Sequence, residues 1–233
     1  MACIVRTFFG LPLVEQTPPD LADFWAGSRD KPGILVFADR RLLWRLARSR
    51  VVKAGLSGNT AAIVPTGRPA RRHVRISTGC DPGEHSGFQG PIRMLARAEE
   101  DGASVFIVDT TPAGVRRIEE NIRFTFPGLR IVGRAVFAPD LVSSITTAIR
   151  KSDPRIVLVG TARMPVFRWV FSQFESVGSA VVVLAEEAGA RMAGRSRGIK
   201  PGAVLFLPFR FLELPLLLGH RLVLGRRRKK SIS

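Results

Sequence analysis

Two carboxylates in the first half of the chain are the candidates for proton-transfer chemistry. Asp39 follows a short apolar run, and Asp81 precedes Pro82 in a glycine-rich stretch between Thr78 and Gly90. A carboxylate can act as a general base when it lies within hydrogen-bond reach of a hydroxyl group. Each also has a structural interpretation that stays open: Asp39 as the N-cap of a following helix, and Asp81 as the start of a turn.

The stretch between Thr78 and Gly90 is predicted to be a loop, because it contains several glycines and a proline. A loop after a strand can bring backbone N–H groups close to a phosphate. The stretch has neither the P-loop spacing nor the dinucleotide-binding spacing. Phosphate binding and a plain connector therefore remain alternatives.

Cysteine and histidine offer no metal chemistry. Cys3 and Cys80 are far apart in the sequence, and the histidines at 73, 85 and 220 share no spacing with other ligand types. We therefore predict no metal site and no cofactor. The two lone cysteines and the absence of a recognisable secretory signal favour the reducing cytoplasm.

The last part of the chain is strongly basic. The protein has 36 basic and 19 acidic residues, a net charge of +17, and beyond Ala190 its only acidic residue is Glu213. Residues 208–230 are largely apolar but too interrupted to supply the roughly 20 apolar residues of a membrane-spanning helix. Such a segment can lie on anionic lipid, where each cation contributes about 1 kcal/mol. A last core helix with a solvated basic tail and a nucleic-acid-binding tail are the alternatives.

Short β-branched runs alternate with amphipathic stretches along the rest of the chain. This alternation predicts an α/β fold with a Rossmann-like, mostly parallel sheet flanked by helices. The expected strands are 34–37, 61–64, 104–108, 129–132, 155–159 and 180–184, and the expected helices are 40–48, 91–101, 113–124, 139–151 and 165–175. We assign residues 1–200 to this domain and residues 201–233 to a basic amphipathic C-terminal appendage.

The second half of the chain carries a collinear series of motifs. Gly102 precedes the strand that ends at Val108, and a helix then leads to a turn and strand at 127–133, Pro-Gly-Leu-Arg-Ile-Val-Gly. The series continues with the strand at 154–160, Trp169, the segment 190–197 and the arginine-punctuated region 212–228. In this order, over about Gly102 to Lys230, the chain resembles the WecG/TagA/CpsF glycosyltransferases.

The resemblance implies a metal-independent transferase. Members of the family move N-acetylmannosamine or a related sugar from a UDP-sugar to a polyprenyl-pyrophosphate-linked acceptor in cell-surface polysaccharide synthesis. The resemblance also implies that the C-terminal appendage docks on the inner face of the cell membrane. By position, Arg221, Arg226 and Arg227 are candidates to bind the pyrophosphate that develops charge as the nucleotide leaves. Lipid headgroups are the alternative ligand of these three arginines.

A family motif of arginine, threonine-glycine and aspartate is partly kept. Its counterparts here are Arg75, Thr78, Gly79 and Asp81, with one residue too many between them. The resemblance makes Arg75, Thr78 and Gly79 substrate-binding candidates.

Other departures from the family pattern occur at positions expected to take part in catalysis or substrate binding. The aspartate proposed as its general base corresponds to Ala54, and the glutamine that grips substrate corresponds to Val166. A Gly-Gly pair after the central strand is replaced by Asp109–Thr110, whose carboxylate would repel the phosphates of a sugar nucleotide. Asp39 and Asp81 remain as the available bases.

Three functions are therefore open from the sequence. The first is an active glycosyltransferase with shifted catalytic groups, and the second is a catalytically inactive relative that serves as a membrane-bound binding or scaffold protein. The third is a basic nucleic-acid-binding protein. It is the least favoured because the chain has no tyrosine, places its phenylalanines in apolar runs and contains no known reader motif.

Overall fold

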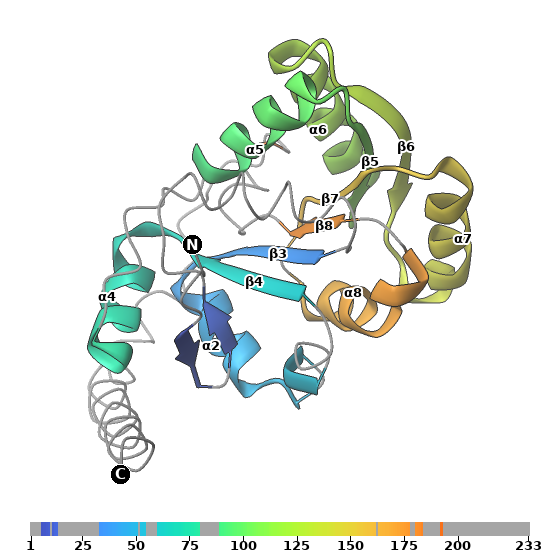
Figure 1. Cartoon of the computed structure of the whole chain (residues 1–233). Coiled ribbons are helices and arrows are strands. Elements are labelled where there is room, and N and C mark those ends of the chain that lie inside the picture. Colours follow the sequence, from blue (N-terminus) through green and yellow to red (C-terminus); the bar gives the residue numbers. More distant parts are fainter. Residues whose placement is uncertain are drawn as a thin grey trace.

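The protein is built on one eight-stranded sheet with strand order β1-β2-β4-β3-β8-β7-β5-β6 (Figure 1). The computed structural model describes residues 6–9, 11–13, 33–50, 52–54, 60–79, 89–161, 163–177, 180–183 and 192. The strands are β1 (Arg6–Phe8), β2 (Leu11–Leu13), β3 (Gly33–Ala38), β4 (Thr60–Pro65), β5 (Ser104–Asp109), β6 (Arg130–Val136), β7 (Ile156–Val159) and β8 (Ala180–Val183).

All strand pairs are parallel except the pair of β1 with β2, which is antiparallel. The parallel sheet flanked by helices confirms the predicted fold class. Because the six strands from β3 to β8 run in one direction, their carboxyl ends meet at the same edge of the sheet. This edge is the place where a fold of this kind can gather functional side chains.

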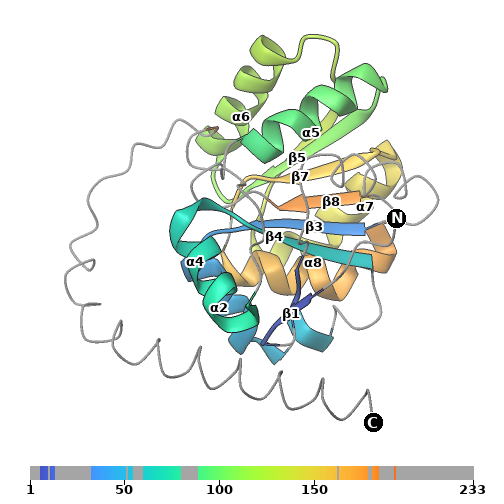
Figure 2. The same ribbon diagram turned by 60° about the vertical axis from the view of Figure 1, so that its left-hand side comes forward.

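Helices cover both faces of the sheet (Figure 2). The helices are α2 (Arg40–Arg48), α4 (Gly67–Thr78), α5 (Gln89–Glu100), α6 (Pro112–Thr125), the 3₁₀ turn η1 (Pro139–Leu141), α7 (Val142–Ser152) and α8 (Met164–Val177). Helices α2, α4, α7 and α8 bury their apolar residues in one core cluster. Helices α5 and α6 bury theirs in a second cluster on the opposite face.

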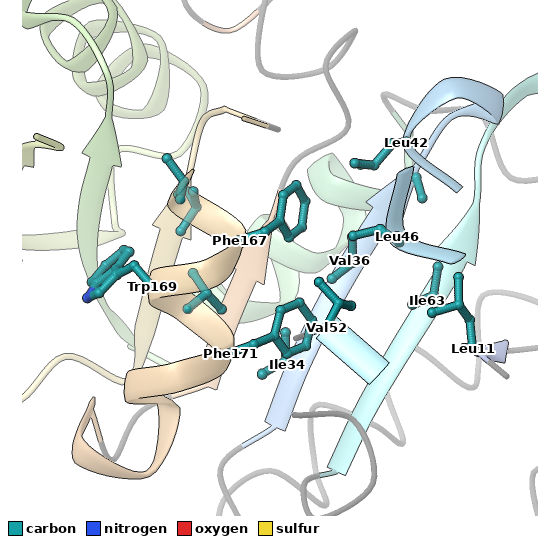
Figure 3. Packing of buried hydrophobic residues seen from close by; sticks show 14 of the residues in the cluster. Leu11, Ile34, Val36, Leu42, Leu46, Val52, Ile63, Phe167, Trp169 and Phe171 are labelled. Atoms are coloured by element: carbon teal, nitrogen blue, oxygen red, sulfur yellow. The ribbon is translucent and has the colours of Figure 1, made fainter. Parts of the chain in front are cut away.

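Strand β3 shows how one sheet serves two cores. Its side chains alternate between faces, so Ile34 and Val36 join the first cluster while Leu35 and Phe37 join the second. Figure 3 shows Phe167 and other side chains of α8 packed toward the first of these faces. All six residues of β3 are buried, which explains why its sequence is a continuous apolar run instead of an alternating one.

Three elements were not anticipated from the sequence. The strands β1 and β2 are only three residues long each and were assigned to no element. Helix α4 falls where no helix was expected, because it opens on Gly67 and Pro69 and its buried residues are only Ala70, Val74 and Ser77. Proline in the first turn is compatible with a helix, since the first N–H groups have no intrahelical partner.

The predicted boundaries otherwise hold to within a few residues. Helix α2 has the predicted limits, whereas β6 runs on to Val136 and the expected helix 139–151 divides into η1 and α7. The predicted division at residue 200, and with it the C-terminal appendage, lies outside the described residues and stays a prediction.

Candidate active site at the carboxyl ends of the strands

Polar residues stand at the end of four parallel strands. Asp39 follows β3, Thr66 follows β4, Asp109 ends β5 and is followed by Thr110, and Thr161 comes shortly after β7. Ligands of open parallel sheets bind at this edge. Strands β3 and β7 are separated only by β8, so their ends lie about 10 Å apart. A ligand with the length of a sugar nucleotide can contact both.

Asp39 and Thr66 form one end of this group. The backbone N–H of Thr66 donates to the carbonyl of Ala38 at 2.8 Å, which places Thr66 beside Asp39. One carboxylate oxygen of Asp39 accepts from the N–H of Leu42 at 2.8 Å and caps α2. The hydroxyl of Thr66 makes no such bond to α4, so the N–H groups of Gly67 and Arg68 are available to an anion, whereas Pro69 has none.

Asp109 lies at the other end and is fully buried. Its Oδ1 accepts from the N–H and the hydroxyl of Thr110. A Cβ atom added at Gly114 would lie 2.5 Å from Asp109 Oδ2, and one added at Gly160 would lie 3.2 Å from the same oxygen. Glycine at these two positions therefore leaves the room that the carboxylate occupies.

The connections that follow the adjacent strands β5 and β7 leave the sheet toward opposite faces. Strand β5 leads into α6, which packs in the second cluster, whereas β7 leads into α8, which packs in the first. Adjacent strand ends whose connections leave to opposite faces mark the ligand-binding position of open α/β sheets. Asp109 and Thr161 stand at this divergence, close to the first turns of α6 and α8.

A sequence model of the glycosyl transferase WecG/TagA/CpsF family matches residues 6–196, which is most of the chain. The protein belongs to this family. No curated protein matches the chain significantly.

The family match has a different extent from the expected one. The motif series was placed between Gly102 and Lys230, but the match begins at residue 6 and ends at residue 196. The first half, including β3, α2 and β4, therefore also follows the family pattern. The region 212–228 lies beyond the matched residues, so its resemblance stays an interpretation.

The three substrate-binding candidates of the first half lie at the far end of α4. This helix starts at the carboxyl edge with Thr66 as N-cap and runs for 12 residues, a length of about 18 Å. Arg75 is exposed in its last turn, and the hydroxyl of Thr78 donates to the Val74 carbonyl at 2.8 Å. Gly79 is the C-cap, with φ +79°. The structure does not bring these residues together with Asp39 and Thr66.

The two expected catalytic positions do not face the edge either. Val166 is 1% exposed and belongs to the first core cluster. Ala54 is exposed and comes shortly before β4; its neighbour Val52 packs near Ile34, at the amino end of β3 (Figure 3). The residue that does follow β4 at the carboxyl edge is Thr66, and it precedes a glycine.

Four predicted site residues, Asp81, Arg221, Arg226 and Arg227, lie outside the described residues. Thr66 and Thr161 were missed as site residues. The signal for Thr66 was present, since a polar residue followed by glycine comes directly after an apolar run at 61–65. Thr161 carries a similar signal, since it follows Gly160 directly after the apolar run 156–159.

Within the described ranges, no group of three or more histidine, cysteine, aspartate or glutamate side chains could hold a metal ion. Over the same part of the chain, the helices are too short or too polar to cross a membrane.

Proposed function

We propose that this glycosyltransferase moves N-acetylmannosamine or a related N-acetylhexosamine from a UDP-sugar to a polyprenyl-pyrophosphate-linked acceptor on the inner face of the cell membrane. The observation that carries the proposal is the family match over residues 6–196. The carboxyl edge supports it, because the N-terminus of α4 offers N–H groups to phosphate beside a carboxylate.

Asp39 is the general base in this proposal. In this proposal the Thr66–Gly67 pair, instead of Ala54, takes the place of the family's aspartate-glycine pair, and its position after β4 at the carboxyl edge supports this. Threonine does not titrate near neutral pH, but Asp39 is the residue next to Ala38, to which Thr66 is hydrogen-bonded. Capping uses one oxygen of the carboxylate, which leaves the second to accept a proton from an acceptor hydroxyl. Asp81 is the alternative base.

Substrate binding tests the function directly. Titration calorimetry with UDP-N-acetylhexosamines is expected to give saturable heat, and adding a polyprenyl-pyrophosphate-linked sugar acceptor is expected to release UDP. Absence of heat with every UDP-N-acetylhexosamine contradicts the proposal. Binding without turnover supports a second candidate, the catalytically inactive relative, which the burial of Val166 and the absence of a carboxylate at Ala54 and Thr66 favour.

The catalytic role proposed for Asp39 can be tested separately from its capping of α2. Asparagine caps a helix about as well as aspartate, so Asp39→Asn retains folding and removes the base. We expect the rate of UDP release to fall about 100-fold or more with UDP-sugar affinity unchanged. Asp39→Asn/Thr66→Asp returns a carboxylate to the neighbouring strand end and is expected to recover part of the rate. If Asp39→Asn is fully active while Asp81→Asn is not, the base is Asp81.

A further inference from the structure

Helices α2 and α4 present two stripes of arginine on their outer sides. Residues three and four apart share a helix face, and each stripe uses the spacing i, i+4, i+7. The exposed residues of the two stripes are Arg41, Arg45 and Arg48 on α2 and Arg68, Arg72 and Arg75 on α4.

The two helices are held side by side, as Figure 2 shows. Trp44 of α2 donates its Nε1 proton to His73 Nδ1 of α4 at 3.2 Å. The guanidinium carbon of Arg48 lies 5.6 Å from the centre of the Trp44 ring, a cation–π distance that orients the side chain and leaves it exposed. The stripes therefore belong to one continuous surface, which we call the arginine face.

The arginine face has no acidic residue on its own helices. Between residues 40 and 79 the sequence contains no aspartate or glutamate. Among the described residues, no carboxylate forms an ion pair with Arg45, Arg48, Arg68 or Arg72. Like charges this close repel one another, and an anionic partner relieves the repulsion.

We infer that the arginine face docks on an anionic lipid surface. The inference rests on the proposed function, because a lipid-linked acceptor must reach the carboxyl edge from a membrane. Both helices start at that edge, α2 after Asp39 and α4 after Thr66, so the arginine face borders the place where the acceptor arrives. The arginine face belongs to residues 40–79 and not to the C-terminal segment 201–233, whose docking stays a prediction.

Lipid is favoured over nucleic acid by the side chains between the arginines. Proteins that bind single strands stack bases on exposed aromatic rings. The large apolar side chains that stand exposed in the described part of the chain are Phe124 and Leu141, and neither belongs to α2 or α4. Trp44 is half-buried and engaged with His73. A surface of cations alone is suited to a layer of anionic headgroups.

The test uses the full chain and vesicles of phosphatidylglycerol mixed with phosphatidylcholine. The variant Arg45→Gln/Arg48→Gln/Arg68→Gln/Arg72→Gln removes four charges and retains good helix formers. The control Arg93→Gln/Arg117→Gln/Arg130→Gln/Arg150→Gln removes the same charge from exposed positions scattered over α5, α6, β6 and α7. Each arginine at an anionic surface changes the partition coefficient about fivefold, so we expect at least a tenfold loss for the first variant and less than threefold for the control.

Equal losses for the two variants, or no loss for either, overturn the inference. Loss of salt-sensitive RNA binding with unchanged vesicle partitioning also overturns it, in favour of nucleic acid. UDP-sugar titration of the same proteins separates the two proposals. Wild-type protein that binds no UDP-sugar but shows the vesicle difference contradicts the proposed function and leaves the docking surface standing.

Discussion

Helices α2 and α4 on one face of the sheet differ in electrostatic character from helices α5 and α6 on the other. Helices α5 and α6 and strand β6 pair several of their arginines with acidic residues, as in Arg97 with Glu100 and Arg116 with Glu120. Helices α2 and α4 are richer in arginine, and the sequence has no acidic residue between 40 and 79. The first region pairs part of its positive charge within the fold, and the second has no acidic residue of its own to pair with its exposed arginines.

This difference supports the inference that the α2–α4 pair faces an anionic partner. Exposed ion pairs add little stability, about 0–1 kcal/mol each, so α5 and α6 do not depend on theirs to fold. The pair formed by helices α2 and α4 contains no acidic residue that could form an ion pair with its own arginines, although Arg48 contacts the Trp44 ring. Its stability has to come from packing, through the Leu42, Leu43 and Leu46 side chains and the Trp44–His73 contact.

Among the substitutions considered, replacing Trp44 is expected to reduce the stability of the protein most, because Trp44 joins α2 to α4. Trp44→Ala loses the hydrogen bond to His73 and the contact with the Phe9 ring at 5.2 Å between centroids. We expect a loss of about 3 kcal/mol in the free energy of unfolding, measured by urea denaturation. Trp44→Phe keeps an aromatic ring and is expected to lose only about 1 kcal/mol. Similar losses for both variants would show that the hydrogen bond dominates.

The substitution Gly114→Ala tests how closely Asp109 is packed at the carboxyl edge. The added Cβ would meet Asp109 Oδ2 at 2.5 Å and Thr111 Oγ1 at 2.7 Å. We expect a net destabilisation of about 2 kcal/mol, although alanine is the better helix former. The same substitution in an Asp109→Ala background is expected to cost at least 1 kcal/mol less, which a double-mutant cycle measures. Additive effects contradict the close packing of the two residues.

The contribution of Glu119 to stability is expected to depend on pH, which tests the ion-paired region around α6. Burial opposes its ionisation, but hydrogen bonds from Arg134 and Arg123, together with their charge, hold the pKa of Glu119 below its ordinary value of 4.5. A lowered pKa stabilises the fold above the unfolded pKa and loses this contribution as the pH falls through the folded value. Glu119→Gln should cost about 1 kcal/mol at pH 7, with the difference from wild type vanishing in acid. Glu120→Gln, whose pair with Arg116 is exposed, should change stability less at every pH.

The smallest effect is expected from the four-arginine variant of the arginine face. Because these charges repel one another, Arg45→Gln/Arg48→Gln/Arg68→Gln/Arg72→Gln should leave stability within about 0.5 kcal/mol of wild type, with any gain larger at low salt. Thermal unfolding at two salt concentrations measures this. A large destabilisation would mean that these arginines hold the helices together.

Much of the fold was predictable because its elements carry strong local patterns. Strands β3, β5 and β7 are buried apolar runs, and α2 has its N-cap and amphipathic period in the expected register. Helix α4 was missed because its buried residues are only Ala70, Val74 and Ser77, a weak apolar stripe opposite its exposed arginines. The short β1 and β2 become strands through pairing with each other and with β4, which local propensity cannot show.

The candidate site was only partly predictable. Asp39 was placed correctly as a residue that follows a strand and precedes a helix, and its capping bond is present. Its part in catalysis stays a proposal. Asp109 was noted as the carboxylate that replaces a Gly-Gly pair after the central strand, but its burial against Gly114 and Gly160 depends on how the strands and α6 pack. Arg75, Thr78 and Gly79 were grouped by motif, and helix α4 carries them away from the edge.

The sequence by itself determined the α/β class, the family resemblance and the cationic excess, because each depends on residue type and order along the chain. The tertiary structure decided the strand order, and with it which strand ends are neighbours. It also decided that the arginines of α2 and α4 share one surface, since two helices separated by a strand become adjacent only when both pack on the same face of the sheet.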